Sequence, residues 1–307
     1  MAQTKQQIQA LLADAGSSPR HRFGQNFMID GNLVRLVADA GQIAAGDVVI
    51  EVGPGTGTLT EELLSRGADV VAVEIDRDLA AMLRARHAQT PRFTLIEGDA
   101  LAGKHEINSE LLAHLAAVRS TADPTYELPP EPAVLRTAAK SSKRIKLVAN
   151  LPYNIASPLV IELLIAGVDV LAFTVQKEVA DRLRGNPDSD DYGPLTVMAQ
   201  LLAKVEVLRS LPPQAFWPAP KIDSALVRMT RDDQIGADAP AVGKFVQQLF
   251  AARRKTLRKA LAQMGFDGER LLASLGIDPQ LRPERLTPRQ CLELFRLAKQ
   301  DWPAPAE

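Results

Sequence analysis

The apolar residues of the first half of the chain fall into two alternating patterns. Short runs are almost entirely apolar, as strands buried in a parallel sheet are. These runs cover residues 47–52, 69–73, 93–96 and 145–149. Other segments space their apolar residues three or four positions apart, which predicts amphipathic helices, the clearest at 4–13 and 31–41. Together the two patterns predict an α/β fold with a mostly parallel, Rossmann-like sheet.

The second half of the chain continues this sheet and then changes character. Three more strands are expected near residues 170–175, 204–209 and 222–229. Beyond them the spacing becomes helical, with helical faces predicted at 249–264, 268–275 and 288–300. The polar segment 231–240, which contains glycine and proline, separates the two patterns. We therefore expect a catalytic domain over residues 1–235 and a small α-helical domain over residues 236–307.

Residues 102–143 separate the third strand from the fourth by more chain than a direct connection needs. A helix is expected around residues 110–115, followed by a proline-rich surface excursion at 123–132. Five basic and five acidic side chains cancel across this segment, so it does not have the charge of an RNA-binding arm. We interpret it as an insertion in the catalytic domain.

Composition narrows the class of protein. With 307 residues and 46% hydrophobic content, the chain can form one large core and a second, smaller one. It has no apolar run of about 18 residues, and residues 1–7 lack the apolar part of a secretory signal, so a soluble, cytoplasmic protein is expected. A single cysteine, Cys291, and four histidines predict neither an internal disulfide nor a metal site.

Charge is distributed unevenly, although the formal net charge is only −1. Residues 244–302 contain twelve Lys and Arg against six Asp and Glu. No acidic residue occurs from 244 to 265, where five basic residues are Arg253, Arg254, Lys255, Arg258 and Lys259. A run of charges is often only a solvated face, but this density favours contact with the phosphates of a nucleic acid.

The apolar run at 145–149 leads directly into Asn150-Leu151-Pro152-Tyr153. At the carboxyl end of a strand, where open α/β sheets bind ligands, this sequence offers a side-chain amide, a backbone carbonyl and an aromatic face. The Asn150 side-chain oxygen and the Leu151 carbonyl can accept both hydrogens of an exocyclic amine such as N6 of adenine, while Tyr153 stacks on the base. The alternative is a turn that only starts a helix.

A second group of candidate residues follows the first three strands. Residues 53–57, Gly-Pro-Gly-Thr-Gly, form a bend before a helix, but Thr58 stands where the dinucleotide fingerprint has its third glycine. A pyrophosphate cofactor is therefore disfavoured. Glu74 ends the second strand, 21 residues after Gly53, where a carboxylate can bind ribose hydroxyls. Asp99 follows the third strand and can accept a hydrogen bond from an adenine amine.

These features together describe an S-adenosylmethionine site, and the chain resembles the 16S ribosomal RNA adenine N6-dimethyltransferases, the bacterial kasugamycin-sensitivity family. The resemblance extends over nearly all of residues 20–300. The matching motifs are Arg22–Phe27, Glu51–Gly57, Glu74–Asp76, Gly98–Ala100, Asn150–Ile155, Gln176–Ala180, Tyr192–Val197, Phe216–Ala225 and Arg253–Leu257. The resemblance implies a monomeric S-adenosylmethionine-dependent enzyme that dimethylates two adjacent adenines near the 3′ end of 16S ribosomal RNA in the small subunit, with a role in small-subunit biogenesis.

The resemblance also implies roles for individual residues. Residues expected to contact the target adenine are Asn150, Leu151, Tyr153 and Phe216. Residues expected to bind S-adenosylmethionine are Gln25, Asn26, Met28, Gly53, Gly55, Glu74, Ile75, Asp99, Ala100 and Asn150. Residues expected to bind RNA are Arg253, Arg254, Lys255 and Arg258. For Phe216, a position in the core beneath its proline-rich loop is the alternative.

Two other functions fit parts of the sequence. An amino methyltransferase acting on DNA adenine or on a glutamine side chain also uses Asn-x-Pro-Tyr. A non-catalytic ribosome-assembly or transcription factor can retain the same fold. The basic segment at 253–259 and the motifs around Gln176 and Phe216 favour ribosomal RNA as the substrate, and the intact cofactor positions favour catalysis.

Overall fold

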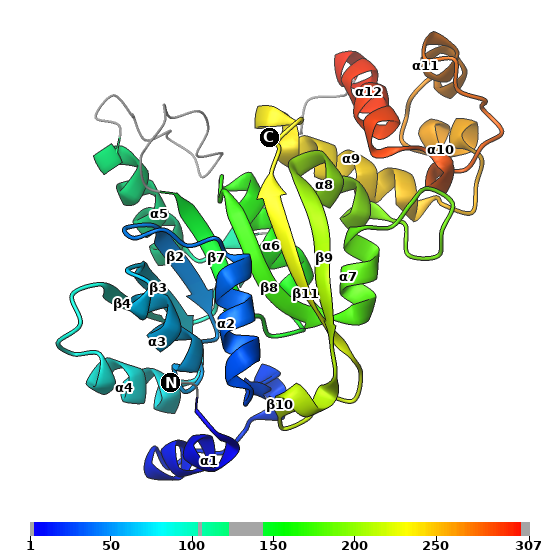
Figure 1. Cartoon of the computed structure of the whole chain (residues 1–307). Helices are drawn as coiled ribbons and strands as arrows, with labels where there is room; N and C mark the ends of the chain where they lie inside the picture. Colours follow the sequence, from blue (N-terminus) through cyan, green and yellow to red (C-terminus); the bar gives the residue numbers. More distant parts are fainter. Residues whose placement is uncertain (1–2, 104–105, 123–143, 302–307) are drawn as a thin grey trace. The chain divides into compact units, whose positions relative to one another are not determined.

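The computed structural model describes residues 3–103, 106–122 and 144–301 (Figure 1). The chain divides into two compact units. One comprises Met1–Ala180 with Val205–Arg231, and the other comprises Asp181–Lys204 with Asp232–Glu307. The second unit therefore includes residues 181–204, which the sequence pattern places in the catalytic domain.

A seven-stranded sheet forms the centre of the first unit. Its strands, in spatial order, are β4 (Phe93–Glu97), β3 (Asp69–Glu74), β2 (Val48–Val52), β7 (Ile145–Asn150), β8 (Val170–Gln176), β11 (Ser224–Arg231) and β9 (Ala203–Leu211). The pairs β2–β3, β2–β7, β3–β4 and β7–β8 are parallel. The pair β8–β11 is antiparallel. The predicted α/β class with a mostly parallel sheet is confirmed.

The direction of the chain reverses at the middle of this sheet. From β2 the strands proceed through β3 to β4, whereas from β7 they proceed to β8 in the opposite direction. Because parallel crossovers are right-handed, the helices after β2 and β3 lie on one face and the helix after β7 lies on the other. These helices are α3 (Thr58–Ser65), α4 (Arg77–Arg86) and α6 (Ala156–Ile165) (Figure 1). Open α/β sheets bind ligands at such a reversal, here the carboxyl ends of β2 and β7.

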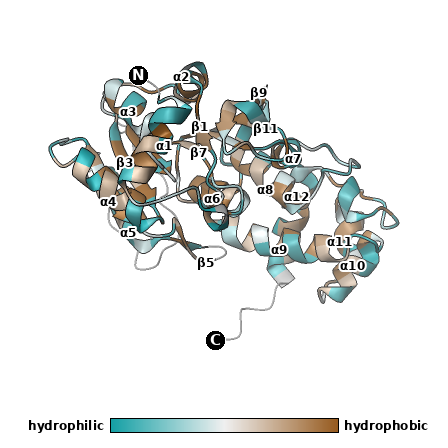
Figure 2. Cartoon of the chain, turned by 90° about the horizontal axis from the view of Figure 1, so that it is seen from below, coloured by the Kyte–Doolittle hydropathy of each residue, from teal (hydrophilic) through white to brown (hydrophobic). Residues whose placement is uncertain are grey.

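The core of the first unit is built from the predicted apolar runs. Every residue of β2 is buried, as is every residue of β7 before Asn150. Helix α2 (Gly31–Ala40) buries Val34 and Val37 in the same apolar cluster as Val148 of β7. Figure 2 shows the result as hydrophobic residues along β3 and β7, whereas α4 carries both hydrophilic and hydrophobic residues.

The N-terminal helix and a two-stranded sheet lie beside this core. Helix α1 (Lys5–Asp14) begins after Thr4, which forms a capping box with Gln7. Phe27 and Met28 form β1 (Phe27–Met28), which pairs with β10 (Phe216–Trp217). The sequence pattern predicted no strand in residues 21–28. A strand of two residues has no apolar period of its own, so only its distant partner defines it.

The first part of the insertion contains a short hairpin and a helix. Strand β5 (Leu101–Gly103) pairs with β6 (Glu106–Ile107), and α5 (Ser109–Ala122) follows. The predicted helix is thus confirmed, with Leu111 and Leu115 completely buried. The surface excursion predicted at 123–132 lies outside the described residues.

The second unit is helical. Its helices are α8 (Pro194–Leu202), α9 (Ala239–Ala251), α10 (Leu257–Gln263), α11 (Gly268–Ser274) and α12 (Pro288–Ala298), and α7 (Lys177–Leu183) leads into it from β8. The predicted helical face at 249–264 is divided between α9 and α10, because Thr256 is extended with φ −66° and ψ 155°. Short 3-10 helices occur in both units. They are His21–Phe23 and Pro213–Ala215 in the first unit, and Gly236–Asp238, Pro283–Arg285 and Lys299–Asp301 in the second.

A buried ion pair joins β2 and β7 at their amino-terminal ends. Lys146 Nζ lies 2.7 Å from Asp47 Oδ2, and the two side chains are only 2% and 5% exposed. Lys146 also donates to the carbonyl of Gln42, and Asp47 accepts from the backbone amides of Ala44 and Arg144. Every polar atom of this buried pair that needs a partner therefore has one.

Two features are absent from the described residues, namely a helix suited to cross a membrane and a cluster of metal ligands. Within residues 3–103, 106–122 and 144–301, none of the helices combines the length and the apolar character that crossing a bilayer requires. In the same residues, no three His, Cys, Asp or Glu side chains come together as metal ligands would.

Candidate active site

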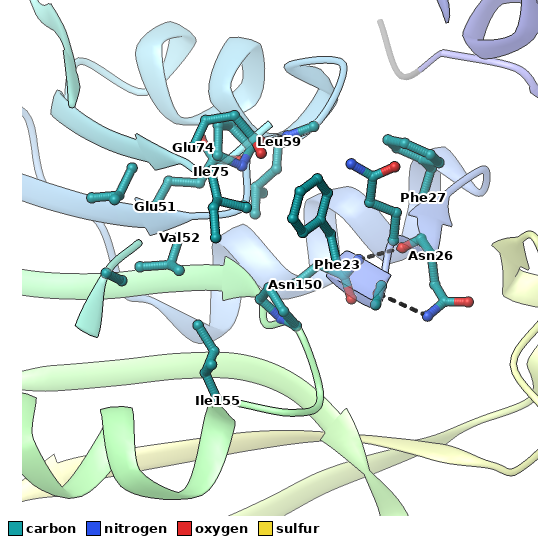
Figure 3. A pocket seen from close by; sticks show the side chains of 18 of the residues that line it. Phe23, Asn26, Phe27, Glu51, Val52, Leu59, Glu74, Ile75, Asn150 and Ile155 are labelled. Atoms are coloured by element: carbon teal, nitrogen blue, oxygen red, sulfur yellow. Dashed lines mark hydrogen bonds between the residues drawn. The ribbon is translucent and has the colours of Figure 1, made fainter. Parts of the chain in front are cut away.

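A cavity that is partly open to solvent lies at the carboxyl ends of β2, β3, β4 and β7 (Figure 3). The ten residues predicted to bind a cofactor all line it, namely Gln25, Asn26, Met28, Gly53, Gly55, Glu74, Ile75, Asp99, Ala100 and Asn150. Segments far apart in the sequence therefore meet at one edge of the sheet.

The bend after β2 needs glycine at the two positions where glycine lines the cavity. Gly53 and Gly55 have φ values of 71° and 60°, a region that other residues rarely adopt. A Cβ atom on Gly55 would lie 2.8 Å from Cε1 of Phe27, and one on Gly53 would lie 3.3 Å from Cγ of Pro152. The bend is therefore packed against two other walls of the cavity, and its bare backbone lets a ligand approach closely.

Glu74, at the end of β3, is 3% exposed and holds the bend in place. Its Oε2 accepts from the amide of Gly55 at 3.1 Å, and its Oε1 accepts from the amide of Asp76 at 2.9 Å. Burial raises the pKa of the Glu74 carboxyl to about 7, although these two amides act in the opposite direction. A carboxylate oxygen can accept more than one hydrogen bond, so Glu74 retains the capacity to bind ribose hydroxyls.

Glu51 is a cavity residue to which the sequence interpretation assigned no chemical role. It is 2% exposed, and its Oε2 accepts from the hydroxyl of Thr60 at 2.6 Å. Burial raises the pKa of the Glu51 carboxyl to about 8, the Thr60 hydroxyl lowers it, and the charge of Glu74 raises it further. The signal in the sequence was one acid inside the otherwise apolar run Val48–Val52.

We expect Glu51→Gln to stabilise the ligand-free protein at mildly alkaline pH. Because the folded pKa of about 8 lies above the ordinary value of 4.5, the stability from this group is complete at low pH and is lost as the pH rises through 8. Glutamine cannot ionise and still accepts from Thr60. The free energy of unfolding of the variant should exceed that of the wild type by about 1–3 kcal/mol near pH 8.

The measurement is urea unfolding of both proteins at several pH values between about 5 and 9. Glu110→Gln removes the same charge from an exposed position on α5 and controls for net charge. Parallel stability profiles of Glu51→Gln and the wild type would contradict the assignment of this titration to Glu51.

Asn150 ends β7 with its side-chain amide engaged on both sides. Nδ2 donates to the main-chain oxygen of Asn26 at 2.6 Å, and Oδ1 accepts from the hydroxyl of Thr174 on β8. The side chain of Asn26 donates to the carbonyl of Gly24 at 3.0 Å. Asn26 therefore meets Asn150 through its backbone, a contact that the sequence interpretation did not include, and Thr174 was missed entirely.

Leu151 and Tyr153 follow Asn150 closely in the chain but are not among the residues that line the cavity. Leu151 is 2% exposed, and Tyr153 is half-buried with its Oη 2.6 Å from Oγ of Ser224. Burial raises the pKa of the Tyr153 hydroxyl, and the bond to Ser224 acts in the opposite direction. This bond fixes the ring beside the turn that follows Asn150.

Phe216 does not agree with its predicted role of stacking on a base. The side chain is 2% exposed and packs in the apolar core with Leu33 and Val34 of α2. The alternative position beneath the proline-rich loop is the one observed, because pairing of β10 with Met28 of β1 turns the ring inward. An aromatic residue that does line the cavity is Phe23.

Gln25 lines the cavity, but its polar atoms bind protein groups. Oε1 accepts from the amide of Arg20 at 2.8 Å, and Nε2 donates to Oδ2 of Asp76 at 3.0 Å. The Arg20 guanidinium also pairs with Asp76 at 2.7 Å. The side chain of Gln25 thus links its own loop to Asp76. A direct contact with the cofactor was expected for it instead.

Asp99 is exposed at the end of β4 and has capacity to bind a ligand. Among the residues that the structure describes, only Oδ1 is engaged, by the amide of Leu101 at 3.1 Å. Asn108, just after β6, donates to the main-chain oxygen of Asp99 at 2.9 Å and accepts from the amides that begin α5. The start of the insertion thus holds Asp99 in position, a role that the sequence interpretation missed.

The residues of the cavity fit S-adenosylmethionine. The glycine bend leaves open backbone beside the cavity, and Glu74 and Asp99 can accept from ribose hydroxyls and from an adenine amine, respectively. Ile75, 40% exposed, offers an apolar face for the adenine ring. With Thr58 at the third glycine position of the dinucleotide fingerprint, the bend does not match a pyrophosphate site.

Comparison with known proteins points to the same chemistry. Residues 16–300 match the family described as ribosomal RNA adenine dimethylase. The chain is 41% identical over 277 residues to ribosomal RNA small subunit methyltransferase A of Hahella chejuensis, covering 88% of this chain and 89% of that protein. The protein of the same name from Magnetococcus marinus is 41% identical over 293 residues, 94% of each chain.

Solved structures with the same fold include two transferases. A dimethyladenosine transferase from Plasmodium falciparum superposes with a TM-score of 0.65 and 21% identity, covering 89% of this chain and 98% of that one. The 23S rRNA methyltransferase ErmE superposes with a TM-score of 0.57 and 26% identity, covering 88% and 98%. From the match over residues 16–300 and the identity to its relatives, the chain belongs to the ribosomal RNA adenine dimethylase family of S-adenosylmethionine-dependent methyltransferases.

Proposed function

We propose that the protein transfers methyl groups from S-adenosylmethionine to N6 of two adjacent adenines in a loop near the 3′ end of 16S ribosomal RNA, giving N6,N6-dimethyladenosine in the small subunit. The observation that carries this proposal is the position of Asn150, which lines the same cavity as Glu74 (Figure 3) and as Asp99. The names of the relatives support the small subunit as the substrate. The proposal includes a cytoplasmic monomer that acts in small-subunit biogenesis.

Asn150 and Leu151 hold the target amine. Asn150 Oδ1 accepts one bond from Thr174 and keeps a second lone pair, and among the described residues no donor meets the Leu151 carbonyl. These two acceptors bind the two hydrogens of adenine N6 and direct its lone pair into the cavity. Tyr153, held by Ser224, packs against the base. Phe216 is left out of this role because of its burial.

The protein contributes mainly positioning. When bound, S-adenosylmethionine supplies an electrophilic methyl carbon with a neutral thioether as leaving group. The residues need to provide no strong base, because N6 becomes acidic only once it has gained the methyl. The base must leave its stack to reach Asn150, which costs less in a loop than in a duplex and favours a loop as the target.

The test is methylation of isolated small ribosomal subunits, naked 16S RNA, a DNA oligonucleotide and a glutamine-containing protein with labelled cofactor. Digestion to nucleosides should give dimethyladenosine from ribosomal RNA. Label in DNA or protein instead would favour the alternative amino methyltransferases. Binding to subunits with no label transferred would favour a non-catalytic assembly factor.

The basic cluster, Arg253, Arg254, Lys255, Arg258 and Lys259, is the part of the second unit that we propose to contact RNA. All five side chains are exposed, around the turn between α9 and α10. Arg258 pairs with Glu269 at 2.9 Å, whereas no ion pair engages the other four within the described residues. Cations without a protein partner are free to bind phosphates.

Replacing Arg253, Arg254 and Lys255 together with alanine is expected to weaken binding to small subunits and to flatten its salt dependence. Each lost phosphate contact lowers the slope of log K against log salt by about 0.7–0.9, so three contacts lower it by about two to three. Affinity for S-adenosylmethionine should not change. The measurement is subunit binding between about 50 and 200 mM salt.

The matched control replaces Arg282 and Arg289, two exposed residues of the same unit that lie within 4.0 Å of Glu284 and Glu293. This variant should keep the wild-type slope. An unchanged slope in the triple variant would show that the basic cluster is only a solvated face.

A further inference from the structure

The two hydrogen bonds to Asn150 determine which way its side-chain amide points. The oxygen of Asn26 is a carbonyl and can only accept, so the Asn150 atom that lies 2.6 Å away must be Nδ2. Oδ1 then faces Thr174, whose hydroxyl donates to it. A reversed amide would place two acceptor oxygens against each other at this distance.

Thr174 is placed for this contact by the sheet itself. It lies on β8 as the direct register partner of Asn150 on β7, and it is fully buried. Partners in register on neighbouring strands direct their side chains to the same face, so the hydroxyl meets the amide without entering the cavity. The hydroxyl of Thr174 is therefore placed to act on a ligand through Asn150.

We infer that Thr174 is a positioning residue for methyl transfer, which holds Oδ1 of Asn150 as the acceptor for the target amine; this inference rests on the proposed function. One lone pair of Oδ1 accepts from Thr174 and the other remains for a hydrogen of adenine N6. Without the hydroxyl, only the Asn26 bond restrains the amide, whose terminal torsion is broad. A smaller fraction of molecules then presents the acceptor in the reactive geometry, which lowers the rate.

The backbone of Asn26, which accepts the other hydrogen bond of the Asn150 amide, is itself held in place. Asn26 lies between Gly24, to which its side chain is bonded at 3.0 Å, and β1, which pairs with β10. Because Asn26 contributes a main-chain oxygen, a side-chain substitution cannot remove the contact. Of the two hydrogen bonds of the Asn150 amide, the bond from Thr174 is therefore the one that a side-chain substitution can remove.

The experiment compares Thr174→Ser with Thr174→Ala, which both lack the methyl group and differ only in the hydroxyl. Thr174→Val keeps the shape of threonine and removes the donor. We expect single-turnover methylation of small subunits to fall about three- to tenfold in the alanine and valine variants and to stay within about twofold of wild type in the serine variant. The Kd for S-adenosylmethionine, measured by calorimetry, should be unchanged in all three.

Equal rates for the serine and alanine variants would overturn the inference, as would a valine variant as fast as the wild type. A fall in cofactor affinity as large as the fall in rate would also overturn it, because it would indicate a general distortion of the cavity. If the valine variant does not fold, the serine and alanine pair decides. Failure of the wild type to form methyladenosine would contradict the proposed function before any variant is compared.

Discussion

Asn150→Ala is expected to lower methyl transfer to adenine by about a hundredfold or more, for the first and the second methyl group alike. Alanine removes the acceptor for one amine hydrogen, so the lone pair of N6 is no longer directed into the cavity. Asn150→Asp keeps an acceptor but places an anionic oxygen 2.6 Å from the carbonyl of Asn26, where Nδ2 now donates. We therefore expect the aspartate variant to be similarly slow.

The measurement is a time course of monomethyl- and dimethyladenosine by mass spectrometry under single-turnover conditions. Asn150 also lines the proposed cofactor site, so the Kd for S-adenosylmethionine is measured separately and the cofactor is kept saturating. Asn32→Ala, at an exposed position at the start of α2, is the matched control. Near-normal rates in Asn150→Ala would show that the turn after β7 does not hold the amine.

The strands of the catalytic sheet could be predicted because burial on both faces makes their sequences nearly continuous apolar runs. The runs at 47–52 and 145–149 correspond to β2 and β7 within one residue at each end. The break between α9 and α10 could not be predicted from apolar spacing, which continues through it. The break depends on the extended backbone of Thr256. Strand β1 could not be predicted either, because it depends on pairing with β10, far along the chain.

The positions of the cavity residues could be predicted because they follow the ends of parallel strands, which meet at one edge of a sheet. The hydrogen-bond partners of these residues could not. The polar atoms of Gln25 are taken by Arg20 and Asp76, and Asn150 is oriented by Thr174 from the neighbouring strand. Such contacts depend on strand register and on the packing of distant segments, which one sequence does not encode locally.

Lys146→Met is expected to lower the free energy of unfolding of the first unit by about 3–5 kcal/mol, because it leaves a buried carboxylate without its cation. Burial by itself raises the pKa of the Asp47 carboxyl. The bond from Lys146, aided by the amides of Ala44 and Arg144, outweighs burial and brings this pKa below its ordinary value. Without the ammonium, the two amides alone must compensate the charge.

Urea unfolding can report on this unit through Trp217, the partner of Phe27 in the β1–β10 sheet. The chain contains two tryptophans, so every variant is made in a Trp302→Phe background. Adding Asp47→Asn to Lys146→Met should recover most of the lost stability, because no charge then remains buried. Arg228→Met breaks a partly exposed pair with Glu206, 3.0 Å apart, and should cost only about 1 kcal/mol or less. Equal losses for Lys146→Met and Arg228→Met would show that burial gives the Lys146–Asp47 pair no special weight. Failure of the double variant to recover would show that the uncompensated charge of Asp47 is not the cause of the loss.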